Sequence, residues 1–195
     1  AVASQTGAAL LVADAPRAMI DLNRAIEEMD WDMLVHGAPP GRVSNGGRRA
    51  RSGLGLVPRR LPGQGEIWNR RMEETELQSR IDGIHQPYHD ALETCLRGLR
   101  DRWGAALLID LHSMPPLGER FGANAAAEYV IGDRFGATSD GGLVAAAFAC
   151  FAEAGARAAH NRPYAGGYAL DRHAAPRRGF HALQLEVDRR SYLDE

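Results

Sequence analysis

Short apolar runs bounded by turn-forming residues predict several β-strands along the chain. Residues 7–16, 105–112 and 128–133 are mostly apolar, which is typical of buried strands, and residues 18–24 fit either a second strand or a turn. Residues 181–190 alternate between apolar and polar positions, so neighbouring side chains are expected on opposite faces of a strand. The apolar side comprises Leu183, Leu185 and Val187, and the polar side Gln184, Glu186 and Asp188.

Two helices are expected between these strands. The longer one is predicted to begin at Thr75, with Gln78 placed to complete a capping box, and to end at Gly104. The shorter helix is rich in alanine, is capped by Asp140 and ends before Gly155. The apolar residues of the longer helix recur at helical spacing and form one stripe: Leu77, Ile81, Ile84, Tyr88, Leu92, Cys95 and Leu99.

The order strand, helix, strand, helix, strand predicts an α/β fold, with a mixed or largely parallel sheet flanked by helices in a single domain. A chain of 195 residues is long enough to bury the core of one such domain. In sheets of this kind, binding sites form just beyond the strand ends. Residues 36–66 are crowded with Gly, Pro and Arg and show no period, so a long loop is expected there.

Composition and charge argue against several classes of protein. Apolar residues make up 45% of the chain and charged residues 25%, which is typical of a folded globular protein. The formal net charge of -2 predicts no general attraction to nucleic acid or to a membrane surface, and the longest apolar run, residues 142–151, is too short to span a bilayer. Cys95 and Cys150 are too few for a disulfide framework and no signal peptide is visible, so a cytoplasmic setting is expected.

An apolar strand that ends in Asp110 and His112 is the first candidate for chemistry. It lies in the segment LLIDLHSMPP, residues 107–116, where two prolines prevent the strand from continuing. A neutral imidazole is a good zinc ligand, and a neighbouring carboxylate commonly holds such an imidazole in place. A hydrogen-bonded pair that only caps the strand end explains the same residues.

Glu186 is the second candidate, because it sits on the polar side of a strand between Leu185 and Val187. Burial of this carboxyl would raise its pKa and suit it to general acid–base catalysis. A solvent-facing glutamate on an edge strand is the alternative interpretation.

Two further segments combine polar side chains with a permissive backbone. Asn23 and Arg24 pair an amide with a planar guanidinium that can bind a carboxylate through two hydrogen bonds, although an ordinary turn with an ion pair between Asp21 and Arg24 fits as well. The glycines of NRPYAGGY, residues 161–168, would let the backbone approach a ligand closely, and a plain surface turn fits equally.

Other patterns give weaker or negative indications. His85 and His89 are four residues apart on the longer helix, a spacing that can hold a metal ion, but no acidic residue of the HExxH kind accompanies them, so we expect them on the helix surface or at an interface. The arginines between residues 42 and 60 have no aromatic residues interleaved, which gives little support to nucleic-acid binding. No P-loop, GxGxxG or GxSxG motif occurs, which argues against nucleotide-dependent and serine-hydrolase chemistry.

Taken in order along the chain, these motifs resemble the N-formylglutamate amidohydrolase (N-formylglutamate deformylase) family. The resemblance runs from about Leu11 to Glu195, and DLHSMP and HALQLEVDRRSYLDE are its most specific parts. The motifs that carry it are DLNR, PYHDAL, LLIDLHSMPP, VIGDRFGATSD, NRPYAGGY and GFHALQLEVDRRSYLDE. The family is related to zinc carboxypeptidases and to the aspartoacylase group, so the resemblance implies a zinc-carboxypeptidase-like α/β fold and metal-dependent cleavage of an N-acyl amino acid.

The resemblance also implies roles in a zinc site. His112 matches a metal-binding histidine, with Asp110 beside it to orient a side chain, and Glu186 matches the glutamate that serves as general base and proton shuttle. One Zn²⁺ ion is implied. The family's other metal ligands come from an N-terminal segment with a Pro-His-(Ser/Ala)-Gly stretch, and neither that segment nor the family's C-terminal helix has a counterpart in these 195 residues.

Substrate-binding residues follow from the resemblance in the same way. Asn23 and Arg24 match an Asn-Arg pair that binds the substrate carboxylate in the related acylases, with Arg17 as a companion. The family loop beside the site is matched by Asn161, Tyr164, Gly166 and Gly167.

We therefore expect hydrolysis of the formyl amide of N-formyl-L-glutamate to glutamate and formate, a step of histidine degradation, with a small-molecule substrate and with neither nucleic acid nor membrane as a partner. A hydrolase of another N-acyl amino acid or small peptide is the alternative, as is a metal-free relative that binds acyl amino acids without turnover. The arginine-rich loop 36–66 would close over a dianionic substrate, and Arg70 or Arg71 would supply a second guanidinium.

Overall fold

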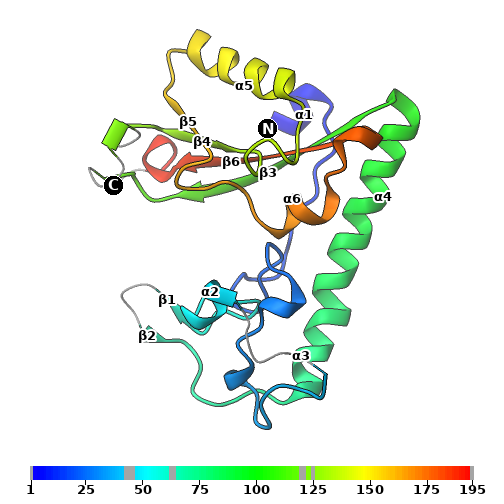
Figure 1. Cartoon of the computed structure of the whole chain (residues 1–195), viewed down its shortest axis with the longest axis vertical. Coiled ribbons are helices and arrows are strands. Elements are labelled where there is room, and N and C mark those ends of the chain that lie inside the picture. Colours follow the sequence, from blue (N-terminus) through cyan, green and yellow to red (C-terminus); the bar gives the residue numbers. More distant parts are fainter. Residues whose placement is uncertain (1, 42–46, 62–64, 119–121, 124–125, 194–195) are drawn as a thin grey trace. The chain divides into compact units, whose positions relative to one another are not determined.

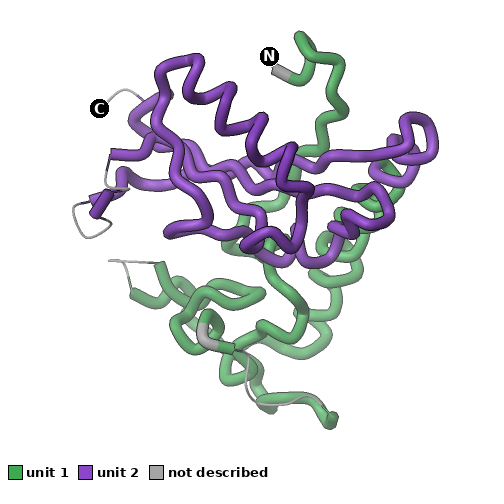
Figure 2. Tube along the Cα trace, turned by 45° about the horizontal axis from the view of Figure 1, so that its top comes forward, with its two compact units in different colours: residues 1–95 green, residues 96–195 purple. Residues whose placement is uncertain are grey.

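The described residues of the computed structural model group into two compact units. The described ranges are 2–41, 47–61, 65–118, 122–123 and 126–193. Unit 1 comprises residues 1–95 and unit 2 residues 96–195 (Figure 2). The expectation of a single domain over the whole chain stays a prediction. Across the described ranges, no helix is both long enough and apolar enough to cross a membrane.

Unit 1 is built from helices and irregular segments around an apolar core. Its elements are α1 (Val2–Thr6), α2 (Gly47–Arg51), the antiparallel pair β1 (Arg60–Leu61) and β2 (Gly65–Glu66), α3 (Glu74–Arg80) and most of α4 (Gln86–Trp103) (Figure 1). Single 3-10 turns occur at Ile26–Glu28 and Trp31–Met33. Leu56 and Val57, from the segment predicted as a long loop, are fully buried in the core, so this segment contributes to packing as well as to connection.

The expectation of a strand at residues 7–16 is wrong. Residues 7–16 have no regular secondary structure and follow directly after α1. Leu10 and Val12 are 73% and 62% exposed, so no burial of their side chains stabilises an extended strand there. Residues 18–24 form turns, which is the second of the two alternatives for that segment.

The long helix begins earlier than predicted and contains a π-helical turn. α3 starts after Glu73, which makes no side-chain capping bond, so the predicted N-cap at Thr75 and its capping box are wrong. Two backbone hydrogen bonds tie Met72 to residues 33 and 35, which fixes the chain just before Glu73 and explains the earlier start. A π-helix, Ile81–His85, then separates α3 from α4.

This π-helical turn changes which side chains are buried. A π-helix has more residues per turn than an α-helix, so the positions after it rotate away from a regular helical pattern. His85 and His89 are 0% exposed, whereas Cys95, a member of the predicted stripe, is exposed. Of the two alternatives for these histidines, the helix surface is wrong and the interface is favoured, since both rings contact backbone carbonyls of another segment. Gly104, with φ +81°, follows the end of α4 as predicted.

Unit 2 contains a four-stranded mixed sheet. Its elements are β3 (Ala106–Met114), β4 (Tyr129–Gly132), α5 (Gly141–Glu153), β5 (Ala158–His160), α6 (Tyr168–His173) and β6 (Phe180–Asp188) (Figure 1). The strand order is β3-β6-β4-β5, with β3 parallel to β6, β4 parallel to β5, and β4 antiparallel to β6. The predicted α/β class and three of the predicted strands are thus confirmed. The sequence pattern missed β5, which has only 3 residues.

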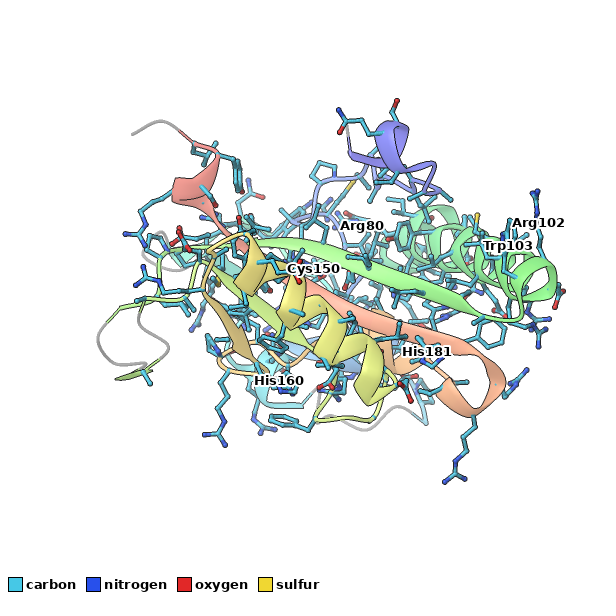
Figure 3. The ribbon with its side chains drawn as sticks, turned by 90° about the horizontal axis from the view of Figure 1, so that it is seen from above. Arg80, Arg102, Trp103, Cys150, His160 and His181 are labelled. Atoms are coloured by element: carbon cyan, nitrogen blue, oxygen red, sulfur yellow. The ribbon has the colours of Figure 1, made fainter. Side chains whose placement is uncertain are left out.

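Helix α5 covers one face of this sheet and starts where the sequence predicts. The Asp140 carboxylate accepts a hydrogen bond of 2.8 Å from the N–H of Gly142 and caps the helix. Val144 of α5 packs with Ile131 and Leu183. Seen from above, α5 lies across the strands with β3 beside it (Figure 3). On β3, an edge strand, the same face remains exposed at Leu107, Ile109 and Leu111, so the expectation that this strand is buried is wrong for that face.

Candidate active site

The register of β3 and β6 places the two main candidate residues side by side. His112 pairs with Glu186, and Asp110 pairs with Gln184, in parallel register. Side chains in register on neighbouring strands project from the same face, and neighbouring strands lie about 4.8 Å apart. Leu183 projects from the opposite face, under α5. The structure therefore brings His112 and Glu186 together on the face of the sheet away from α5.

Asp110 sets the protonation pattern of His112. Nε2 of His112 lies 2.8 Å from Oδ2 of Asp110, and the two side chains are 19% and 16% exposed. An ionised carboxylate can only accept, so Nε2 donates, and the lone pair of the neutral ring lies on Nδ1. This is the tautomer of a histidine that binds a metal through one ring nitrogen while a carboxylate holds the other.

Glu186 is a buried carboxylate in the middle of the sheet. Its strand, β6, lies between β3 and β4, and Glu186 is 7% exposed, so the alternative of a solvent-facing glutamate on an edge strand is wrong. The side-chain amide of Gln184 donates a hydrogen bond of 3.0 Å from Nε2 to Oε1 of Glu186. Buried carboxylates need such donors, because desolvation of an unpartnered charge is costly.

The side chain of Asn161 fixes the loop 161–168 to the end of β4. Oδ1 of Asn161 accepts a 2.9 Å hydrogen bond from the N–H of Asp133, and Nδ2 donates to Oδ1 of Asp133 at 2.7 Å. Asn161 is 5% exposed and has φ +59°, a left-handed conformation that asparagine adopts more readily than most residues. It therefore anchors the loop, and its contact with substrate stays a prediction.

Glycines allow the loop backbone to lie directly on β4. A Cβ at Gly132 would lie 2.6 Å from the carbonyl carbon of Ala165, closer than any real contact of that kind. Gly166 has φ +105°, which side-chain-bearing residues rarely adopt. Gly167 is the N-cap of α6, so the loop leads straight into that helix.

Tyr164 lies on the same face of the sheet as Glu186. It packs against an apolar cluster that includes Met114 and Val130. Val130 is in register with Glu186 on the neighbouring strand and so projects from the same face. The loop predicted to lie beside the site is therefore brought to the face that carries His112 and Glu186.

The carboxyl of Asp133, next to this loop, has a pKa below its ordinary value. Burial acts to raise the pKa, but hydrogen bonds from the Asn161 side chain and the Gly136 backbone lower it, and the nearby His160 lowers it further. Nε2 of His160 lies 3.1 Å from Oδ1 of Asp133. Because the folded-state pKa lies below the unfolded-state value, ionised Asp133 stabilises the fold above the unfolded pKa of about 3.9, and this contribution is lost as pH falls through the folded pKa.

Substitution Asp133→Asn is expected to lower the free energy of unfolding at pH 7 by about 1–2 kcal/mol and to flatten its fall between about pH 5 and pH 3. Urea unfolding at a series of pH values measures both effects. The exposed Asp32 provides the control, since Asp32→Asn should keep the pH dependence of the wild type. Parallel curves for Asp133→Asn and the wild type would contradict the prediction.

Arg24 in unit 1 is buried and holds backbone carbonyl groups. Its Nε donates to the carbonyl of Leu54 at 3.1 Å, and Nη1 donates to the carbonyl of Asn23 at 2.7 Å. The pKa of Arg24 is lowered by burial, and the carboxylate of Asp21, with Oδ2 at 3.8 Å from Nε, opposes this. Nη2 of Arg17 lies 2.9 Å from the same oxygen of Asp21.

Two histidines that the sequence did not identify as important support this segment. Nε2 of His85 lies 2.9 Å from the carbonyl oxygen of Arg24, and Nε2 of His89 lies 3.0 Å from that of Leu22. Their spacing of four residues on one helix was the feature that indicated a common binding partner. In the structure that partner is the backbone near Arg24. This segment belongs to unit 1 and the β3–β6 pair to unit 2, so their meeting in one site stays a prediction.

Several arginines predicted to close over a substrate are engaged in ion pairs. Arg59 and Arg60 pair with Glu66 at 2.9 Å and 3.3 Å, and Arg70 pairs with Glu76 at 2.9 Å. These pairs do not prevent movement, since exposed ion pairs contribute little stability. The proposed closure of this segment stays a prediction.

A metal site is only partly provided by these residues. A catalytic zinc needs about three protein ligands. In the part of the chain that the structure describes, no three His, Cys, Asp or Glu side chains cluster closely enough to hold a metal ion. His112, with its ring held by Asp110, fits one ligand position.

A cavity of about 560 Å³ opens beyond the carboxyl end of β6. Asp188, two residues after Glu186 on the same face of β6, forms part of its wall, and hydrogen bonds from Arg190 lower the pKa of Asp188. The other lining residues are Leu117, Ala126, Glu128, Arg157, Arg190 and Ser191. The size suits a small molecule, but His112 and Glu186 are not among the lining residues, so its part in the site stays a prediction.

Comparison with known proteins gives one consistent family. The sequence model described as N-formylglutamate amidohydrolase matches residues 1–193. The chain is 26% identical over 196 aligned residues to the N-formylglutamate deformylase of Pseudomonas aeruginosa and 29% identical over 194 to that of Pseudomonas putida. In each case 99% of this chain and 67% of the relative are covered.

A solved structure agrees with this match. The crystal structure of N-formylglutamate amidohydrolase from Ralstonia eutropha JMP134 is similar with a TM-score of 0.83 and 32% sequence identity. The similarity covers 92% of this chain and 65% of that one. The chain thus spans about two thirds of the length of the relatives that it matches, and its fold is that of the corresponding part.

Proposed function

Because the chain belongs to the N-formylglutamate amidohydrolase family, we propose that it hydrolyses the formyl amide of N-formyl-L-glutamate, giving glutamate and formate. The names of the relatives support this substrate. The single observation that carries the chemistry is the in-register placement of His112 and Glu186 on one face of the sheet. We propose that this reaction serves histidine degradation in a cytoplasmic setting.

In this proposal Glu186 is the general base and then the general acid. Its carboxylate takes a proton from the water whose oxygen attacks the formyl carbon. It returns that proton to the amide nitrogen as the C–N bond breaks, so that the amine leaves as glutamate and the carbonyl as formate. Asn23 and Arg24, with Arg17, are proposed to bind a substrate carboxylate, which would hold the scissile amide in place. Tyr164 and the glycines of its loop would line the same face.

His112 is proposed to hold a zinc ion as one of its ligands. A bound zinc would polarise the formyl carbonyl and lower the pKa of a bound water. The support for this role is the Asp110–His112 hydrogen bond, which selects the tautomer with its lone pair on Nδ1. Among the described residues His112 is the one suitable ligand, and no set of three metal-binding side chains accompanies it.

The wild-type chain, assayed with added Zn²⁺, is expected to release formate from N-formyl-L-glutamate, and chelation is expected to reduce release to background. A formate dehydrogenase-coupled assay measures the rate, and metal analysis measures bound zinc in the wild type and in His112→Ala. N-acetyl-L-glutamate and N-formyl-L-methionine test whether the formyl group or the glutamate side chain determines the substrate. A purified chain without zinc and without turnover of any of these would favour a non-catalytic binding protein.

A further inference from the structure

Side chains hold three consecutive carbonyl groups of the turn that contains Asn23 and Arg24. Nε2 of His89 lies 3.0 Å from the carbonyl oxygen of Leu22, and Nε2 of His85 lies 2.9 Å from that of Arg24. The carbonyl between them, that of Asn23, accepts a 2.7 Å hydrogen bond from Nη1 of Arg24. A carbonyl oxygen can only accept, so both imidazoles donate through Nε2. The backbone of this turn is therefore held at each of the three residues.

The two imidazole donors belong to one continuous helical segment and are buried. His85 is the last residue of the π-helix, and His89 lies one turn further along, in α4. Both residues are 0% exposed, and their ring centroids are 4.6 Å apart. Enclosed rings in a packed interior have little freedom to rotate, so the helix sets the positions of both donors. Single π-helical turns occur frequently at functional sites.

Asp21 holds the N–H side of the same turn. Its Oδ1 accepts from the N–H of Asn23 at 2.9 Å, and its carbonyl oxygen accepts from the N–H of Arg24 at 3.1 Å. Both backbone groups of Asn23 and both of Arg24 are thus engaged, whereas a chain reversal needs only its own turn hydrogen bond. Residues that bind a ligand must be held to within about 0.5 Å, and supporting hydrogen bonds of this kind provide that precision.

We propose that His85 and His89 are positioning residues for substrate binding: they hold the turn so that Asn23 and Arg24 present their side chains to the substrate carboxylate. The inference rests on the proposed function, in which Asn23 and Arg24 bind that carboxylate. The histidines act through the backbone and exchange no proton in this role. A guanidinium that binds a carboxylate through two hydrogen bonds is sensitive to displacement, because both bonds must form at once.

The test compares His85→Gln and His89→Gln with His85→Asn and His89→Asn. Glutamine places its amide nitrogen near the position of the imidazole Nε2 and can still donate to the carbonyl, whereas asparagine is one methylene shorter and does not reach it. In the asparagine variants KM for N-formyl-L-glutamate is expected to rise about tenfold or more, while kcat changes by less than about threefold. The glutamine variants should keep KM within about threefold of the wild type.

Substrate analogues separate positioning from general damage to the fold. N-formyl-L-glutamine and N-formyl-L-isoglutamine each replace one carboxylate of the substrate by an amide. For the analogue that lacks the carboxylate bound by Arg24, the asparagine variants and the wild type should have nearly equal kcat/KM, because the interaction that the histidines serve is missing in both. A purely structural role would lower kcat/KM by the same factor for all three compounds, and that result overturns the inference.

Leu92→Ala supplies the matched control, because Leu92 is a buried apolar residue three positions after His89 on α4. Its truncation should lower the free energy of unfolding but leave KM within about threefold. Urea unfolding shows which variants are folded. If neither asparagine variant folds, the histidines are required for the fold itself and the inference is overturned.

Binding of L-glutamate, the proposed product, gives a readout that does not depend on turnover. Isothermal titration calorimetry should show an affinity about tenfold or more weaker in the asparagine variants than in the wild type. Equal affinity and equal KM in these variants and the wild type overturn the inference. A wild type that binds L-glutamate without hydrolysing the substrate overturns the proposed hydrolysis, and weaker binding by the asparagine variants then still supports the inference. A wild type that does neither overturns both.

Discussion

Replacing Glu186 by glutamine is expected to lower kcat/KM for N-formyl-L-glutamate by about 10²–10⁴-fold, the usual contribution of a general acid–base group. Glutamine has the same shape but cannot accept a proton from water at neutral pH. Its carbonyl oxygen can still accept the hydrogen bond that Gln184 donates at 3.0 Å, so the fold should be preserved. Steady-state kinetics with the zinc-supplemented protein measures the loss, and thermal unfolding checks that the variant is folded.

The matched control for this substitution is Glu153→Gln, at the exposed end of α5. It makes the same chemical change at an exposed position. It should leave kcat/KM within about twofold, as surface changes commonly do. Equal activity in Glu186→Gln and the wild type would remove Glu186 from the mechanism. Loss of folding in Glu186→Gln would be separated from loss of chemistry by the unfolding curve.

The strands that carry the site were the most predictable part of the chain. Residues 181–190 alternate in polarity, and β6 indeed presents Leu183 to α5 and Glu186 to the other face. The alternation could not show that β6 is a central strand, because the identity of its neighbours depends on contacts far apart in sequence. That placement buries Glu186 and Gln184, and it makes their hydrogen bond matter. The hydrogen bond from Gln184 to Glu186 was therefore invisible in a pattern that marks both residues only as polar.

The long helix shows a different limit of sequence reasoning. An even helical period predicted an apolar stripe, but the π-helix at Ile81–His85 changes the phase in the middle of it. His85 and His89 become the fully buried side chains, and each is hydrogen-bonded to a carbonyl near Arg24. The carbonyl groups of Leu22 and Arg24 need hydrogen-bond partners, and these groups lie outside the helix. No pattern within residues 74–103 contains this information.

Substitution Gly132→Ala is expected to lower the free energy of unfolding by about 2–3 kcal/mol, at the upper end for overpacking. The added Cβ would lie 2.6 Å from the carbonyl carbon of Ala165 and 2.8 Å from the nitrogen of Gly166, and neither backbone atom can rotate away as a side chain would. The hydrogen bond from the Arg134 N–H and the ion pair of its side chain with Asp171 hold the loop down. Urea unfolding measures the change.

The same substitution at Gly98, inside α4, provides the control. A Cβ at Gly98 meets no atom within 4 Å, so Gly98→Ala should raise stability by about 0.5–1 kcal/mol through helix propensity. Opposite signs at the two glycines would mean that close approach of the loop, rather than the loss of glycine, destabilises Gly132→Ala. The displaced loop carries Tyr164, so we expect the variant to lose activity as well. A variant as stable as the wild type would mean that the loop does not rest on β4.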